Sequence, residues 1–170
     1  LIASPSLQDG TFDNSVILLF DFSDNQGAEG VILNCTTGQT VGDVLCSSEF
    51  KQLRKLPVFY GGPVDEDKLS FVSFRWTKAG KLDCDIGISA PEAIEAMKVS
   101  GTLVKAFAGK SAWTKGQLEG ELEGHAWYVA SPIKTLLTMP QDETLWKNTL
   151  QELSPFHHII SLTPENPFLN

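Results

Sequence analysis

The sequence predicts an α+β fold, and three observations lead to this prediction. Two apolar runs of β type, 15–20 and 30–34, flank a turn-rich segment. Farther along, the segment 70–88 alternates apolar and polar residues on both sides of a Lys-Ala-Gly turn, which is typical of a hairpin. In the segment 142–153 the buried side is marked at helical spacing by Trp146, Thr149, Leu150 and Leu153.

The strands are expected in a definite order. The runs 15–20 and 30–34 predict neighbouring buried strands, and 58–60 predicts a short strand that runs into Gly61-Gly62-Pro63. In the hairpin, one face is expected to carry Val72, Phe74 and Trp76 from the first strand and Leu82, Cys84, Ile86 and Ile88 from the second. Two more strands are predicted at 102–107 and 125–129.

The clearest helix start lies at Trp113 to Glu119. Thr114 fits an N-cap, and Gln117 three residues later can reach back to the cap N–H, which makes a capping box. Trp113 and Leu118 stand where a hydrophobic staple would join them across the helix start. We therefore expect a helix from Lys115 to about Glu123.

Four other helices are expected. Thr40 can cap a short helix, and helical packing continues from there until Pro57. Ser89 and Glu92 form a second capping box, Ser131-Pro132 places proline at a first helical position, and 142–153 forms the amphipathic helix. These elements predict one domain over 1–153. The tail 154–170, which contains prolines, is expected to run along the surface or meet a partner.

Composition and charge exclude several classes of function. The formal charge of −8 opposes direct nucleic-acid binding, because phosphate contacts need a basic surface. The longest apolar run, 16–20, is too short to cross a bilayer, and no secretory signal precedes it. An odd set of three cysteines without a C-x-x-C pair favours a reducing cytoplasm.

Four blocks of sequence occur in a definite order: 1–5 with Phe12 and 15–16, then 27–34, then 58–64, and finally 113–121 with Trp127. Taken together and in this order, they resemble the YqgE/AlgH family of bacterial proteins of unknown function. The resemblance implies a single α+β domain with a mixed, strongly bent β-sheet flanked by short helices, in a bacterial cytosolic protein. Some members carry the label of proposed transcriptional regulator, and the resemblance supplies no catalytic residues.

The chain departs from the family pattern at three places. Cys35-Thr36 stand where the family usually has Arg-Pro, and Ala112 replaces the glycine before the motif tryptophan. The histidine that usually follows the first long strand is missing from Asp21-Phe22-Ser23. A function that depends on the usual arginine or histidine is therefore not expected here.

Most possible chemical sites have a structural explanation that we favour. Gly61-Gly62-Pro63 could form an anion nest, but glycine dihedrals before a proline also suit a strand-ending turn. Asp83 and Asp85 are better read as a solvated strand face than as metal ligands, and Ser131-Pro132-Ile133-Lys134 as a helix start than as an S-x-x-K nucleophile. The lone His125 and the adjacent His157-His158 do not suit a zinc site.

The sequence favours a non-catalytic protein that binds a small molecule or another protein, with any regulatory role acting through that contact. We expect no metal and no cofactor. The candidate surface consists of Asn34, Gly61, Gly62, Pro63, Trp113 and Gln117. The alternative is a hydrolase or transferase with Cys35 or Ser131 as nucleophile.

Overall fold

The computed structural model describes residues 1–23 and 27–153, so the predicted tail lies outside the described residues. The helices are α1 (Val41–Val44), the 3-10 helix η1 (Ser48–Phe50), α2 (Ala90–Lys98), α3 (Gln117–Glu123) and α4 (Glu143–Leu153). The strands are β1 (Ile2–Ala3), β2 (Ile17–Ser23), β3 (Gly27–Ile32), β4 (Thr36–Thr40), β5 (Pro57–Tyr60), β6 (Val64–Trp76), β7 (Leu82–Ile88), β8 (Thr102–Trp113) and β9 (Trp127–Tyr128).

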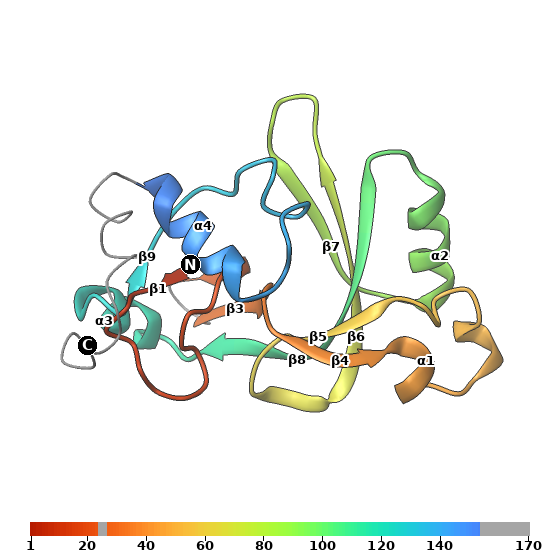
Figure 1. Cartoon of the computed structure of the whole chain (residues 1–170), viewed down its shortest axis with the longest axis horizontal. Coiled ribbons are helices and arrows are strands. Elements are labelled where there is room, and N and C mark those ends of the chain that lie inside the picture. Colours follow the sequence, from red (N-terminus) through yellow and green to blue (C-terminus); the bar gives the residue numbers. More distant parts are fainter. Residues whose placement is uncertain (24–26, 154–170) are drawn as a thin grey trace, which may run out of the picture.

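The strands form one large mixed sheet and a small antiparallel pair, β1 with β9 (Figure 1). The large sheet has the order β2-β3-β8-β5-β4, and β8 also pairs with β6, which pairs with β7. Only the β5–β8 pair among these is parallel. The predicted mixed sheet with short helices beside it is confirmed.

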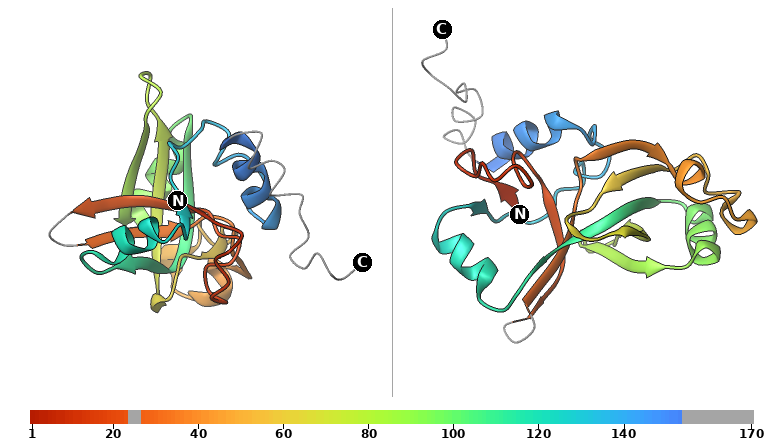
Figure 2. Two further views of the ribbon diagram at one scale, coloured as in Figure 1. Left: turned by 90° about the vertical axis from the view of Figure 1, so that its left-hand side faces the viewer. Right: turned by 90° about the horizontal axis from the view of Figure 1, so that it is seen from below.

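The sheet bends along β8. The first part of β8 pairs with β6, and its last residues pair with β3, from Gly30↔Ser111 to Ala28↔Trp113. Gly109 lies at the irregularity of the β6–β8 pairing, between Ala108, which pairs with Leu69, and Lys110, which pairs with Val64. Its φ of 70° is a conformation that L side chains rarely adopt. The bend is visible in Figure 2, where β2 and β3 run across the direction of β6 and β7.

Each side of the sheet has its own hydrophobic core. The larger core joins Phe59, Phe74 and Phe107 to apolar residues of β2 and β3, to the segment 131–141, and to α4. The smaller core lies on the other side, where Phe71, Val104 and Ala106 pack with α2 and with residues near α1. The long strand β8 therefore contributes alternate residues to both cores.

The predicted strands are present at slightly different bounds. β2 and β3 are antiparallel neighbours, and the hairpin of β6 and β7 has the register Val72↔Ile86 and Phe74↔Cys84. β6 begins six residues before the predicted alternation, and β8 continues to Trp113. Periodicity missed the extension of β6 because its first residues are exposed and four of them, 65–68, are charged.

Three helix starts agree with the prediction. Thr40 and Asp43 form a capping box at α1, Ser89 and Glu92 form one at α2, and α4 covers the predicted amphipathic segment. Trp146 in α4 donates its Nε1–H to the carbonyl oxygen of Ala3 at 2.7 Å, which fixes the helix against β1. Pro57 begins β5 rather than ending a continuous helix.

The prediction of a helix at Ser131-Pro132 is wrong. The segment contains turns instead of a helix, and the adjacent residues Leu136 and Leu137 are both buried. The carbonyl oxygens of Leu136 and Met139 accept hydrogen bonds from the side-chain amide of Gln141, which favours an irregular backbone here. Among the described residues, no helix is long and apolar enough to span a membrane.

Candidate functional site

The helix entry at α3 is held by Gln117. Its Oε1 accepts hydrogen bonds from the backbone N–H of Thr114 at 3.1 Å and from the Thr114 hydroxyl at 3.2 Å. The back-bond predicted for the capping box is thus present. The helix starts later than predicted, at Gln117, because Gly116 turns the chain at φ 78° and takes the N-cap position.

Glu121 gathers three donors behind this entry. Its Oε2 accepts the indole N–H of Trp113 at 2.9 Å and that of Trp127 at 2.8 Å. Its Oε1 accepts from the amide of Gln117 at 3.0 Å. Both indoles are buried, so the carboxylate satisfies donors that would otherwise lack partners.

Aromatic packing completes this structural unit, which we call the Glu121 cluster: Phe12, Trp113, Gln117, Glu121 and Trp127. The ring of Phe12 stacks on Trp113 with centroids 6.1 Å apart and meets the edge of Trp127 at 5.7 Å. The two indoles pack edge to face at 6.0 Å. Trp113 is therefore rigidly positioned from one side.

A cavity of about 420 Å³ lies beside Trp113. It is lined by Asp21, Gly27, Ala28, Glu29, Val64, Ala112, Trp113 and Thr114. We call it the Trp113 cavity. Its lining includes a cross-strand row, because Asp21 in β2 pairs with Glu29 in β3, and Glu29 pairs with Ala112 in β8.

The two carboxylates of this row have different surroundings. Glu29 forms an ion pair with Lys110 and accepts a hydrogen bond from its ammonium group. Asp21 is exposed, and within the described residues its side chain has neither an ion pair nor a hydrogen bond. Like charges directly opposite each other on two strands repel, so the row favours a cation placed beside Asp21.

Gly61 and Gly62 serve a close contact between the β5–β6 connection and β8. The N–H of Gly61 donates to Ala108, and its carbonyl oxygen accepts from Ile32 and from the hydroxyl of Ser111. A Cβ at Gly61 would lie 2.3 Å from the carbonyl oxygen of Gly109. One N–H of the possible anion nest is therefore already used within the protein, which agrees with the favoured interpretation of a strand-ending turn.

Asn34 also makes two internal hydrogen bonds. Its Oδ1 accepts from the backbone N–H of Val16 at 2.8 Å, and its Nδ2 donates to the carbonyl oxygen of Asn14 at 2.9 Å. The side chain thus joins the end of β3 to the residues before β2. Both polar atoms of the Asn34 side chain are therefore hydrogen-bonded within the protein.

The structure places the six predicted surface residues in different roles. Trp113 lines the cavity, Gln117 lies behind it in the Glu121 cluster, and Pro63 precedes the lining residue Val64. Sequence reasoning missed Asp21 and Glu29 as lining residues. Their positions on either side of the first turn were the available signal, because a hairpin brings such residues opposite each other.

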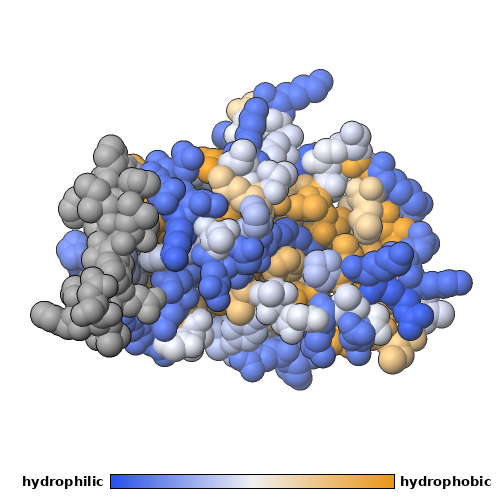
Figure 3. Space-filling model, in the orientation of Figure 1, coloured by the Kyte–Doolittle hydropathy of each residue, from blue (hydrophilic) through white to orange (hydrophobic). Residues whose placement is uncertain are grey.

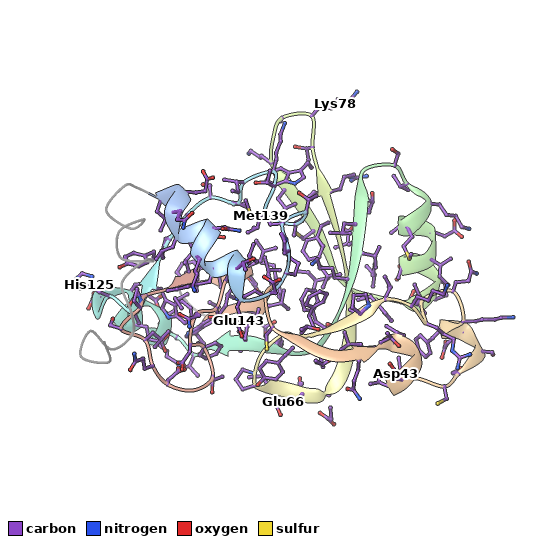
Figure 4. All side chains as sticks on the ribbon, in the orientation of Figure 1. Asp43, Glu66, Lys78, His125, Met139 and Glu143 are labelled. Atoms are coloured by element: carbon purple, nitrogen blue, oxygen red, sulfur yellow. The ribbon has the colours of Figure 1, made fainter. Side chains whose placement is uncertain are left out.

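A second polar group that sequence reasoning missed is Lys105. It is 6% exposed in the middle of β8, where its Nζ donates to Oε1 of Gln141 at 2.9 Å and lies 4.4 Å from the centroid of the Phe59 ring. Burial lowers the pKa of this ammonium to about 8. Gln141 in turn donates to the carbonyl oxygens of Leu136 and Met139, so Lys105 anchors the segment that Figure 4 shows crossing the sheet at Met139.

The thiol and hydroxyl proposed as nucleophiles lack the surroundings of activated groups. Burial raises the pKa of the Cys35 thiol, whereas a nucleophilic thiol needs a lowered pKa. Figure 4 shows His125 at the outer end of the molecule beside α3, away from the β3–β4 connection that carries Cys35. Ser131 lines a mainly apolar cavity of about 320 Å³, and its hydroxyl has no hydrogen-bond partner among the described residues.

The remaining acidic candidates show no metal geometry. Asp83 pairs with Arg75, and Asp85 accepts a hydrogen bond from the hydroxyl of Ser73 at 3.1 Å. Across residues 1–23 and 27–153, no group of three or more histidine, cysteine or carboxylate side chains could hold a metal ion.

These features define the class of protein: an α+β protein with a bent mixed sheet and a cavity at the bend. The family model described as AlgH-like matches residues 1–156, and the chain belongs to that family. A protein of Streptomyces coelicolor named "UPF0301 protein" is 32% identical over all of this chain and 93% of its own length. A protein of the same name from Cytophaga hutchinsonii is 33% identical over all of this chain and 96% of its own length.

Two solved structures have the same fold. A crystal structure of a Corynebacterium diphtheriae protein superposes with a TM-score of 0.74 at 24% identity, covering 96% of this chain and 90% of that one. The solution structure of the AlgH protein from Pseudomonas aeruginosa superposes with a TM-score of 0.67 at 22% identity, covering 96% and 91%. At these identities the likeness concerns the fold.

Proposed function

We propose that this protein is a non-catalytic binding protein whose site is the Trp113 cavity, and that any regulatory role acts through the occupant of that cavity. The observation that carries the proposal is the row Asp21–Glu29–Ala112 in the lining of this cavity. A volume of about 420 Å³ lies in the range of small-molecule sites. The occupant could be a free small molecule or a side chain of a partner protein.

The lining favours an occupant that carries a positive charge on an apolar frame. Asp21 supplies a carboxylate that has no partner among the described residues, and Glu29 adds a second that Lys110 partly neutralises. Val64 and Ala112 add apolar lining, and β8 continues into Trp113, whose buried indole the Glu121 cluster holds in place. An ammonium or guanidinium group beside Asp21 would relieve the like-charge pair across β2 and β3.

Two positions of this lining are also places where the chain departs from the family pattern. Ala112 adds a methyl group where a glycine is usual, and Asp21 belongs to the segment that lacks the usual histidine. The occupant is therefore proposed to differ from that of relatives with the usual residues. A transcription-related role would act through a partner, because a net charge of −8 opposes direct contact with DNA.

The enzyme alternative has less support. It requires either Cys35, whose pKa is raised, or Ser131, which does not begin a helix. Iodoacetamide labelling of Cys35 across pH separates the alternatives. Reaction with the profile of an ordinary thiol supports the binding proposal, and rapid labelling below pH 7 supports the enzyme.

The direct test is titration of the isotope-labelled protein with spermidine, arginine methyl ester and tetramethylammonium, followed by NMR. Acetate, phosphate and glucose are the matched controls. We expect saturable shifts of amides in β2, β3 and the end of β8 with at least one cation and none with the controls. Equal shifts with the controls, or shifts elsewhere only, would contradict the proposal.

A further inference from the structure

The outer edge of β7 is open to another strand. β7 pairs with β6 on one side, and none of the described strands pairs with its other side. No backbone hydrogen bond from another described segment reaches residues 82–88. An open strand edge offers a row of N–H and C=O groups that an extended peptide can pair with.

One face of this edge is apolar. The register places Ile86, Val72 and Lys105 in one row across β7, β6 and β8, and Cys84, Phe74 and Leu103 in the next. Ile86 is 42% exposed and Leu103 is 37% exposed, although each is a large apolar residue. Figure 3 shows apolar side chains at the surface over this part of the sheet, between the segment 131–141 and α2.

On the same face, the indole N–H of Trp76 lacks a hydrogen-bond acceptor among the described residues. Trp76 ends β6 opposite Leu82, and its indole Nε1 is enclosed. A buried donor without an acceptor is costly, so it calls for an explanation. An acceptor brought by an added strand would supply one.

The other face of β7 is acidic. Asp83 and Asp85 are both exposed there, opposite Arg75 and Ser73 of β6. Arg75 partly neutralises Asp83 at 3.3 Å, whereas the only described partner of Asp85 is the neutral hydroxyl of Ser73. A second copy of this chain, paired edge to edge and antiparallel, would set these carboxylates against their own counterparts, which is destabilising.

We propose that the open edge of β7 binds an extended segment of another protein, in which apolar residues alternate with lysine or arginine. Its apolar side chains would extend the face of Ile86 and Leu103, and its basic side chains would face Asp83 and Asp85. The site is distinct from the Trp113 cavity, because β7 pairs with the last part of β6 whereas the cavity is lined by Val64 at its start.

The probe is the capped peptide Val-Lys-Val-Lys-Val-Lys-Val, which matches the seven residues of β7. The controls are the same peptide with glutamate for lysine, and the lysine peptide with every backbone amide N-methylated. NMR titration is expected to shift the amides of β7 and the indole N–H of Trp76, with both controls at least about tenfold weaker. Equal binding of either control, or shifts that leave β7 unmoved, would overturn the proposal.

A charge reversal gives the matched variant. Asp83→Lys with Asp85→Lys should reverse the preference, so that the glutamate peptide binds more tightly than the lysine peptide. If this variant does not fold, Asp85→Asn replaces it and should weaken the lysine peptide by roughly threefold. Unchanged preference in the folded variant, or sedimentation of the protein as a β7-mediated dimer, would contradict a basic partner.

Discussion

Two carboxylates on opposite sides of Trp113 have contrasting surroundings. Glu121 accepts from two indoles and an amide, and aromatic rings enclose this cluster. Asp21 faces the cavity and has no partner among the described residues. The comparison teaches that a carboxylate whose oxygens are already occupied supports the fold, whereas one with free oxygens in a cavity is available for a ligand.

The largest effect is expected on the structural side, from Glu121→Ala. This change leaves the indole N–H groups of Trp113 and Trp127 without their acceptor, which should cost about 2–4 kcal/mol in the free energy of unfolding. Urea denaturation measures the change. Glu121→Gln is the matched control, since its remaining oxygen can still accept from the indoles, and its loss should be smaller; equal stability of Glu121→Ala and wild type would break the comparison.

The second effect concerns the glycines of the candidate surface. In Gly61→Ala the new Cβ would meet the carbonyl oxygen of Gly109 at 2.3 Å, and we expect a loss of about 2 kcal/mol. Gly120→Ala is the control in α3, where nothing lies within 4 Å of the new Cβ, and it should stabilise by about 0.5–1 kcal/mol. Thermal unfolding that shows the same sign for both variants would refute the packing explanation.

The third effect concerns Lys105, a buried cation whose contribution to stability should depend on pH. Because burial lowers its folded pKa to about 8 from 10.5, the folded state binds fewer protons than the unfolded state between these values. The destabilisation is therefore fully present below pH 8 and is relieved as pH rises toward 10.5. Wild type should gain on the order of 1–2 kcal/mol relative to Lys105→Met over pH 7.5–10.

Measuring the difference between the two proteins is necessary because other groups titrate nearby. Burial, with the charges of Asp83 and Asp85, raises the pKa of Cys84 to about 11, which lowers stability at high pH in both proteins. That contribution cancels in the difference. A difference that stays constant with pH would contradict the burial of a charged Lys105.

The smallest effect on stability is expected at Asp21. Asp21→Asn removes an exposed charge without a described partner, so unfolding should change by no more than about 0.5 kcal/mol. Ala112→Gly is made alongside it, because it removes a methyl group from the cavity lining and so changes the volume of the cavity, whereas Asp21→Asn changes its charge. Chemical denaturation checks both, and a large loss in Asp21→Asn would assign this residue a structural role.

The local parts of the fold could be predicted from the sequence, because their signals lie within a few residues. The β6–β7 hairpin follows from alternation, the helix start at Thr40 from its capping side chain, and the capping box of α2 from a pair three residues apart. The bend at Gly109 could not be predicted, since it depends on which strands pair with each part of β8. The helix predicted at Ser131-Pro132 is absent, and the hydrogen bonds from Gln141 to the carbonyl oxygens of Leu136 and Met139 show how contacts beyond the start signal decide the backbone there.

The candidate site was predictable only in part, for the same reason. Trp113 lies in a local motif that the sequence displays, and it lines the cavity. Asp21, Glu29 and Ala112 come together only through the registers of β2, β3 and β8. Lys105 reads as an ordinary polar position in a strand until packing of the segment 131–141 buries it.

The most direct test of the central claim measures stability and cation binding together in Asp21→Asn and Glu121→Gln. The probe is whichever of spermidine, arginine methyl ester or tetramethylammonium binds the wild type most tightly. We predict that Asp21→Asn weakens binding at least about fivefold at unchanged stability, while Glu121→Gln loses stability. Unchanged affinity in Asp21→Asn, or loss of affinity only in proportion to lost stability, would contradict the claim that Asp21 is a ligand-binding carboxylate.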